Sequence, residues 1–310
     1  MAVNDLAKAW QNYFDSKMPN HARPRFKSKK RSKNSFKTDR AKVIDNKLRL
    51  DKPRGLKAWY DIRLAECPRW CGTIKLATVV KEADGYYVSL SIDVNETINP
   101  KNGTTVTAVD ANVARFDYKA AGSYQSVPTI TPRLLNLYQR ITQYQRLLAR
   151  KRMANPTNFR SHNYVVTRTK LQQAYQQVTR IQEDLLHKFT AQLIHTNDVV
   201  VIEDLDNLHM RMNKHLAKNL HRSMFGKFKV LMQYKCTWHG VKLVMADRFY
   251  PSTQRCSKCG FIKIGADKVS LAGNQTHHTG HDDYVCYECG AVMRRDQNAV
   301  ENLIQYAEIN

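Results

Sequence analysis

The chain contains the run Val199-Val200-Val201-Ile202-Glu203-Asp204, in which four β-branched residues lead into two acids. A short apolar run bounded by polar residues is typical of a strand buried on both faces of a parallel sheet. Because ligands of open α/β sheets bind beyond the carboxyl ends of their strands, Glu203 stands where a metal or a reacting group would be held. An ordinary acidic exit from a strand into a loop is the alternative interpretation.

Two other acids occupy comparable positions. The apolar run 104–109 ends in Asp110 and predicts a second strand with an acid at its carboxyl end. Near the C-terminus, Asp296 and Val300 begin an apolar stripe at helical spacing, and a helix that packs this stripe on the sheet turns Asp296 inward. The sequence therefore predicts a cluster of three carboxylates, Asp110, Glu203 and Asp296.

Charge and length narrow the class of protein. With 50 Lys and Arg residues against 27 Asp and Glu residues, the 310-residue chain carries a formal net charge of +23. Such an excess suits a polyanionic partner, because phosphate neutralisation with counterion release dominates nucleic-acid affinity. A generally solvated basic surface is the alternative. The sequence has no apolar run of about 18 residues and no signal-peptide pattern, which predicts a cytoplasmic protein without a membrane span.

Cations and spaced aromatic residues fill the segment 21–37, and Asp39 is the first acid after it. This combination suits RNA binding, in which cations pair with phosphates and aromatic rings stack on bases. A basic arm that does not stack is the alternative. The candidate nucleic-acid contacts are Arg23, Arg25, Phe26, Lys27, Lys29, Lys30 and Arg31.

The N-terminal part is expected to combine a helix with a small sheet. Residues 1–18 have an amphipathic helical pattern, and the later runs 72–80 and 86–92 are predicted to pair as a hairpin. Cys67 and Cys71 lie at the edge of this hairpin. Because no second cysteine pair is nearby, we interpret them as packed free thiols rather than metal ligands.

Two long helices are predicted next, one from Thr131-Pro132 to the break at 155–158 and one over about 164–195. They would form an antiparallel hairpin with a basic outer face, which is either solvated or a groove for nucleic acid. The cations of this face are Arg146, Arg150, Lys151, Arg152, Arg160, Arg168 and Lys170. Another helix is predicted at 216–234 and a short strand at 242–246.

Four cysteines occur as two C-x-x-C-G knuckles, Cys256-Ser257-Lys258-Cys259-Gly260 and Cys286-Tyr287-Glu288-Cys289-Gly290. Two such knuckles supply a tetrahedral, closed and therefore structural zinc site. The 26 residues between them exceed the usual spacing, so the ribbon must carry a loop. His277, His278 and His281 in that loop are alternative ligands, and redox disulfides are a further alternative.

Taken together, these motifs resemble those of the TnpB (OrfB) family of transposon-encoded RNA-guided DNA nucleases, relatives of the type V CRISPR effectors. The matching stretches are Arg23-Pro24-Arg25-Phe26-Lys27, the strand ending at Asp110, Val201-Ile202-Glu203-Asp204-Leu205, the run 252–260, and Arg294-Arg295-Asp296-Gln297-Asn298-Ala299. The resemblance implies an α/β, RNase H-like (RuvC-like) fold. Its catalytic triad maps onto Asp110, Glu203 and Asp296, and its zinc ribbon maps onto Cys256, Cys259, Cys286 and Cys289.

The resemblance also implies a division into domains. It places a helical segment and basic arm in 1–42, a partial N-terminal β-barrel (wedge-like) in 43–98, a RuvC-like nuclease domain in 99–252 with a helical hairpin insertion at 131–195, the zinc ribbon in 253–291 and the last nuclease helix in 292–310.

The activity implied is Mg²⁺-dependent DNA cleavage directed by a guide RNA, in a bacterial or archaeal cell and close to the nucleoid. Asp110 would hold both ions of a magnesium pair, while Glu203 and Asp296 hold one each and Arg295 contacts a phosphate. Asn112 stands where the family commonly has a small residue, and we expect it to crowd the backbone near the metal.

Two other functions stay open at this point. Family members usually begin with a further N-terminal portion, which favours a guided repressor or an inactive nucleic-acid-binding remnant. A DNA-joining transposase also uses three acids on an RNase H-like fold. Its last acid is usually a glutamate, however, and no ribbon normally precedes it.

Overall fold

The structure is a computed structural model that describes residues 2–16, 21–26, 34–52, 55, 59–94, 100–101, 103–204, 224–270 and 273–309. The chain divides into two compact units, Met1–Thr97 and Ile98–Asn310. Several predictions fall outside the described residues, namely those for Lys27, Lys29, Lys30, Arg31, Leu205 and the first residues of the helix at 216–234.

Within its described residues, the N-terminal unit has the helix α1 (Ala2–Phe14) and two antiparallel three-stranded sheets. One sheet joins β1 (Ser35–Thr38), β5 (Thr73–Lys81) and β6 (Tyr86–Asp93), and the other joins β2 (Lys42–Ile44), β3 (Lys47–Arg49) and β4 (Asp61–Arg63). The β5–β6 pair confirms the predicted hairpin. Its apolar side chains pack around Ala41, Leu48 and Ala77, which form a small core.

The packed state predicted for Cys67 and Cys71 is wrong. Both are free thiols, but both are exposed, in the loop between β4 and β5. The core of this unit is too small to extend under that loop, so a thiol placed there meets solvent rather than apolar neighbours.

The second unit is built on a five-stranded sheet with the order β11-β10-β7-β8-β9. Its strands are β7 (Val106–Ala111), β8 (Arg115–Ala120), β9 (Ser123–Pro128), β10 (Val199–Glu203) and β11 (Lys242–Ala246). β10 is parallel to both of its neighbours, and Val200, Val201 and Ile202 are buried, as the apolar run predicted. β7, β8 and β9 form an antiparallel meander.

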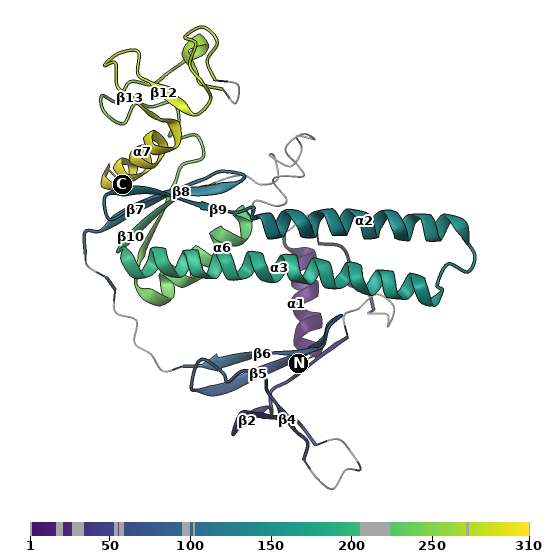
Figure 1. The fold of residues 1–310 in the computed structure, drawn as a ribbon. Helices are drawn as coiled ribbons and strands as arrows, with labels where there is room; N and C mark the ends of the chain where they lie inside the picture. The colour runs from purple at the N-terminus through teal and green to yellow at the C-terminus, as the bar shows by residue number, and fades with distance from the viewer. Residues whose placement is uncertain are drawn as a thin grey trace. The chain divides into compact units, whose positions relative to one another are not determined.

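Helices cover both faces of this sheet (Figure 1). On one face, α3 (His162–Thr196) and α6 (Phe225–His239) pack the rings of Phe189 and Phe228 against Phe116 of β8. On the other face, α7 (Arg295–Ile309) packs Val300 and Leu303 on the sheet. The sheet is therefore the middle of three layers, as expected when apolar strands are buried on both sides.

The helical hairpin consists of α2 (Pro132–Ala154) and α3, close to the predicted limits. Thr131 caps α2 by accepting a hydrogen bond from the backbone N–H of Leu134. The apolar stripe between the two helices is buried at its centre, whereas Tyr175 is exposed, and its hydroxyl accepts a hydrogen bond from Gln145.

Two element boundaries also differ from expectation. The helix predicted to end at Tyr234 continues to His239 and stops where Gly240 adopts a φ of 65°. The strand β9 was not predicted. In the part of the chain that the structure describes, no helix is both long and apolar enough to cross a membrane.

Candidate functional site

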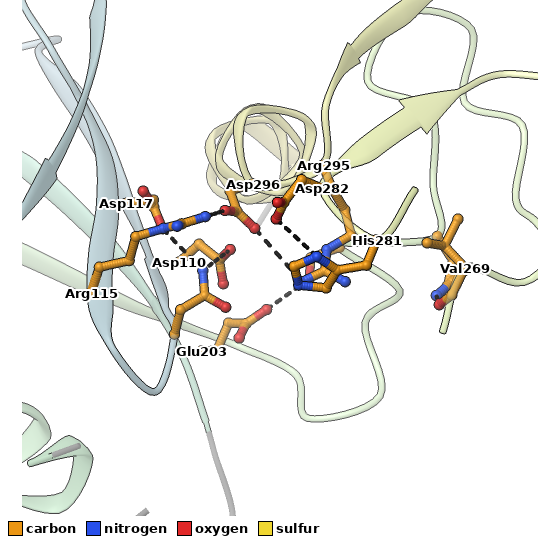
Figure 2. A network of polar contacts seen from close by, with 12 residues as sticks. Asp110, Arg115, Asp117, Glu203, Val269, His281, Asp282, Arg295 and Asp296 are labelled. Carbon is orange, nitrogen blue, oxygen red and sulfur yellow. Dashed lines mark hydrogen bonds and ion pairs between the residues drawn. The ribbon is translucent and has the colours of Figure 1, made fainter. Parts of the chain in front are cut away.

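The three predicted acids meet at one edge of the sheet (Figure 2). Asp110 lies near the end of β7 and Glu203 ends β10, and the two strands are parallel neighbours, so their carboxyl ends coincide. Asp296 lies in the first turn of α7, whose apolar stripe fixes its orientation toward the sheet. The backbone topology thus brings together side chains from three separate elements.

A fourth acid, Asp117 of β8, belongs to the same cluster. Carboxylate oxygens of Asp110, Asp117 and Asp296 all lie within 4.8 Å of one another, which is the spacing of ligands around a metal ion. Glu203 is not among these three acids, but it lies close enough for its charge to raise the pKa of Asp110 more than any other charge does. The sequence contained a signal for Asp117, which lies between the aromatic residues Phe116 and Tyr118. Because successive side chains of a strand face opposite sides, Asp117 faces away from the core that these two residues enter.

Two neighbouring side chains hold the acids in place. The Asn112 amide nitrogen donates to Asp110 Oδ2 at 3.1 Å and to Asp117 Oδ2 at 3.0 Å. Arg115 Nε donates to Asp117 Oδ2 at 2.9 Å, and the same guanidinium pairs with Asp296. Asn112 therefore bridges two carboxylates, rather than simply crowding the backbone as expected.

Burial makes this cluster electrostatically unusual. Desolvation raises the pKa of Asp110 well above its ordinary value, and the charges of Glu203, Asp296 and Asp117 raise it further. Desolvation also raises the pKa of Glu203, although Ser252 opposes this by donating its hydroxyl to Glu203 Oε1 at 2.7 Å. A divalent cation would relieve the mutual repulsion of these groups, and their oxygen-only donor set fits Mg²⁺.

The cluster is open to solvent on the side of β8 and α7. A cavity of about 160 Å³ lies there, and it is lined in part by Arg115, Asp117, Tyr124, Arg294 and Asp296. Arg295, the predicted phosphate contact, has a largely buried side chain that pairs with Asp296 at 3.8 Å. Its role toward a phosphate stays a prediction.

The four cysteines of the ribbon form a second candidate metal centre. Their sulfur atoms lie within 4.8 Å of one another, with Cys256 Sγ to Cys289 Sγ at 3.8 Å and Cys259 Sγ to Cys286 Sγ at 3.5 Å. Four sulfurs placed tetrahedrally about 2.3 Å from zinc would be about 3.8 Å apart, so the geometry fits. His277 and His281 are engaged elsewhere, with Asp267 and Asp282 respectively.

A buried lysine side chain also supports a zinc ion at the cysteine cluster. Lys263 is fully buried, and its ammonium has no hydrogen-bond partner among the described residues. It lies 4.3 Å from the ring centroid of Tyr284 and 4.0 Å from that of Tyr287. A buried ammonium is costly unless an anion compensates it. Four thiolates around Zn²⁺ carry a net negative charge that would do so. No pattern in the sequence predicts this role for Lys263.

The helix α7 also holds the first cysteine knuckle through amide side chains. Asn298 accepts a hydrogen bond from the backbone N–H of Ser257 at 2.9 Å and donates to the carbonyl of Arg255 at 2.6 Å. Asn302 donates to the carbonyl of Ser252 at 2.8 Å and also to that of Arg255. Asp296 belongs to the same helix, so α7 both positions an acid of the carboxylate cluster and binds the first cysteine knuckle.

The predicted nucleic-acid contacts are found in several settings. Arg25 and Phe26 are exposed, and the Arg23 guanidinium lies over the ring of Trp10 at 5.7 Å. On the helical hairpin, Arg150 and Arg152 are exposed.

Lys151 differs from these arginines. Its ammonium donates to the carbonyl of Asn163 at 2.7 Å and to the Thr167 hydroxyl at 2.8 Å. These bonds join α2 to α3, so Lys151 has a structural role within the hairpin.

The fold is an α/β nuclease fold of the kind found in a type V CRISPR effector. The fold is similar to that of a solved Cas12f1–sgRNA–target DNA complex. The similarity covers 74% of this chain and 45% of the Cas12f1 chain, with a TM-score of 0.52 and 16% sequence identity. Two family models match the sequence as well: "Probable transposase" (OrfB, IS605 type) over residues 89–214, and "Cas12f1-like, TNB domain" over residues 225–303. These matches confirm the resemblance to the TnpB (OrfB) family that the motifs carry.

Three curated relatives share one description but match different shares of the chain. A Streptomyces pristinaespiralis protein named "Putative RNA-guided DNA endonuclease" is 27% identical over 305 residues, which is 98% of this chain and 69% of that protein. Two Mycobacterium tuberculosis proteins given the same description are 28% identical over 155 residues, which is 48% of this chain and 31% of theirs. The chain thus spans less than half of the Cas12f1 chain and a third or less of the mycobacterial relatives.

Proposed function

We propose that this protein is an RNA-guided, Mg²⁺-dependent DNA endonuclease encoded by a transposable element. The observation that supports this most is the meeting of Asp110, Glu203 and Asp296 at one edge of the sheet, from three elements far apart in the sequence. The names of the relatives supply the substrate class and the guide.

The acids would hold the catalytic ions. Asp110, Glu203 and Asp296 would be their ligands. When bound, Mg²⁺ supplies an activated water and stabilises the leaving oxygen of the phosphodiester. Ser252 orients Glu203 by donating a hydrogen bond to its Oε1. The raised pKa of Asp110 means that binding metal also drives its deprotonation.

The guide RNA and the target DNA would be the partners. Base pairing between them would select the target, while the protein reads duplex shape and a short flanking motif. The net charge of +23 suits this double polyanion. Exposed Arg25 and Phe26 in the arm, and Arg150 and Arg152 on the hairpin, are the residues we expect to contact phosphates and bases.

Zinc would have a structural role only. Four cysteines complete its coordination shell, so no position remains for water or substrate. We propose that the resulting ribbon fixes the start of α7, and with it Asp296, through the amide contacts of Asn298 and Asn302.

Cleavage of a guided DNA substrate tests the proposal. Asp110→Ala should reduce cleavage in Mg²⁺ by more than about 100-fold, since even substitutions beside metal ligands cost 10- to 100-fold. Glu308→Ala provides the matched control, because this acid is exposed near the end of α7 and should leave the rate unchanged. Cleavage that survives Asp110→Ala would remove the proposed function.

The same assay separates the competing functions. Salt-sensitive binding of RNA and target DNA with no product in Mg²⁺ or Mn²⁺ would instead identify a guided repressor or an inactive remnant. Joined DNA products would identify a transposase. RNA that copurifies with the protein, once sequenced, would supply the guide needed for the assay.

A further inference from the structure

Asp117 lies in the carboxylate cluster, although the three-acid pattern does not include it. The pairing of β7 with β8 places Asp117 directly opposite Asp110. Because successive side chains of a strand face opposite sides, Phe116 and Tyr118 enter the core while Asp117 faces the cluster. The register of one antiparallel hairpin therefore adds a fourth acid to the site.

Its position is that of a ligand. Oxygens of Asp117, Asp110 and Asp296 lie within 4.8 Å of one another. Around an octahedral Mg²⁺ with bonds of about 2.1 Å, neighbouring oxygens are about 3 Å apart and opposite ones about 4.2 Å apart. The Asp117 side chain is 14% exposed and borders the 160 Å³ cavity, so waters of a hydrated ion can reach it.

A cation already bridges this part of the cluster. The guanidinium of Arg115 pairs with Asp117 through Nε and with Asp296 through its terminal nitrogen. Asn112 orients the other pair, Asp110 and Asp117, by donating to both. Two independent contacts therefore direct Asp117 at the two acids between which a metal would be bound.

We propose that Asp117 is an additional carboxylate ligand for a hard divalent cation at this site, and that Arg115 competes with that cation for Asp117 and Asp296. This inference rests on the proposed metal site but assigns a residue outside its triad. A merely structural Asp117 would act only through Arg115, by fixing the position of its guanidinium.

Mn²⁺ binding to the zinc-loaded full chain, without nucleic acid, tests the assignment. Electron paramagnetic resonance of free Mn²⁺ gives the Kd without any cleavage. Asp117→Asn keeps the size of the side chain and should weaken Mn²⁺ binding about 10- to 100-fold. Arg115→Gln should tighten binding severalfold, because a competing cation is removed. Glu308→Gln is the control, since Glu308 is an exposed acid near the end of α7.

The double variant decides between a ligand and an anchor. If Asp117 is a ligand, Asp117→Asn weakens Mn²⁺ binding in the Arg115→Gln background as it does alone. If Asp117 only anchors Arg115, Asp117→Asn has no effect in that background, which overturns the inference. A cooperative melting transition shows that each variant is folded, and the shift of its melting temperature on adding Mn²⁺ provides a second readout.

The test of Asp117 can fail while the proposed function stands, and the two failures can be told apart. Unchanged Mn²⁺ affinity in Asp117→Asn, together with loss of cleavage in Asp110→Ala, would leave the nuclease standing and remove Asp117 from its site. A wild-type chain that binds no Mn²⁺ at this cluster would remove both proposals.

Discussion

The cysteine cluster and the carboxylate cluster are both candidate metal centres, but they are built in opposite ways. The cysteines come from two short knuckles, each closed by a glycine with positive φ, so local sequence makes most of the site. The acids come from β7, β8, β10 and α7, so only the sheet topology brings them together. The cysteine cluster is closed and offers soft sulfur donors, whereas the carboxylate cluster is open, offers hard oxygen donors and accepts hydrogen bonds from Arg115 and Asn112. A locally built centre suits a permanent metal, whereas an assembled, charged one suits an exchangeable metal.

The largest effect is expected when one thiolate is removed from the cysteine cluster. Cys286→Ser should abolish the bound zinc, because a serine hydroxyl is a poor zinc ligand and structural sites need all four donors. The ribbon should then lose its fold, and metal analysis of the purified protein should find no zinc. Cys67→Ser is the matched control, since that thiol is exposed and belongs to the other unit. Full zinc content in Cys286→Ser would contradict the assignment.

The next largest effect is expected from a change of pH, which should act on the carboxylate cluster through Asp110. Burial raises the pKa of Asp110, so the folded state binds a proton that the unfolded state has lost. Without Mg²⁺, this group's contribution to stability is present at low pH and is lost as pH rises from about 3.9 to the raised pKa. Asp110→Asn should remove this part of the pH dependence in urea unfolding. Mg²⁺ binding should show the opposite trend and strengthen as pH rises. A variant with the wild-type pH profile would argue against a raised pKa of Asp110.

The buried ammonium of Lys263 offers a smaller perturbation of the cysteine centre alone. Lys263→Met keeps the apolar stem between Tyr284 and Tyr287 but removes the charge near the thiolates. We expect a chelator to release zinc roughly tenfold faster, a typical size for a neighbour of metal ligands. Lys258→Met is the control, because Lys258 is exposed in the first knuckle. Equal release rates in the two variants would deny Lys263 a role in charge compensation.

The smallest expected effect is at the contact between the two regions. Ser252→Ala removes the hydrogen bond to Glu203 Oε1 and should cost about 1 kcal/mol of binding free energy, or roughly fivefold in Mg²⁺ affinity, measured by calorimetry. Ser257→Ala should leave the affinity unchanged, because that hydroxyl contacts the sulfur of Met293. A large loss in Ser257→Ala would mean that the ribbon affects the acids by another route.

Features with a strong local pattern could be predicted from the sequence. The apolar run of β10 predicted a buried parallel strand, the stripe of α7 predicted an inward Asp296, and the knuckles predicted the cysteine cluster. β9 was missed because it is an exposed edge strand without apolar alternation. Asp117 was missed because its importance depends on the register with β7, and strand register is set by pairing rather than by composition.

The amide contacts of α7 have a consequence for how this protein can vary. Asn298 and Asn302 bond to main-chain atoms of residues 252–257 and to none of their side chains. Surface residues of the ribbon can therefore be exchanged, and the segment between its knuckles lengthened or shortened, while the helix still docks in the same register. The segment of 26 residues found here is one such tolerated length.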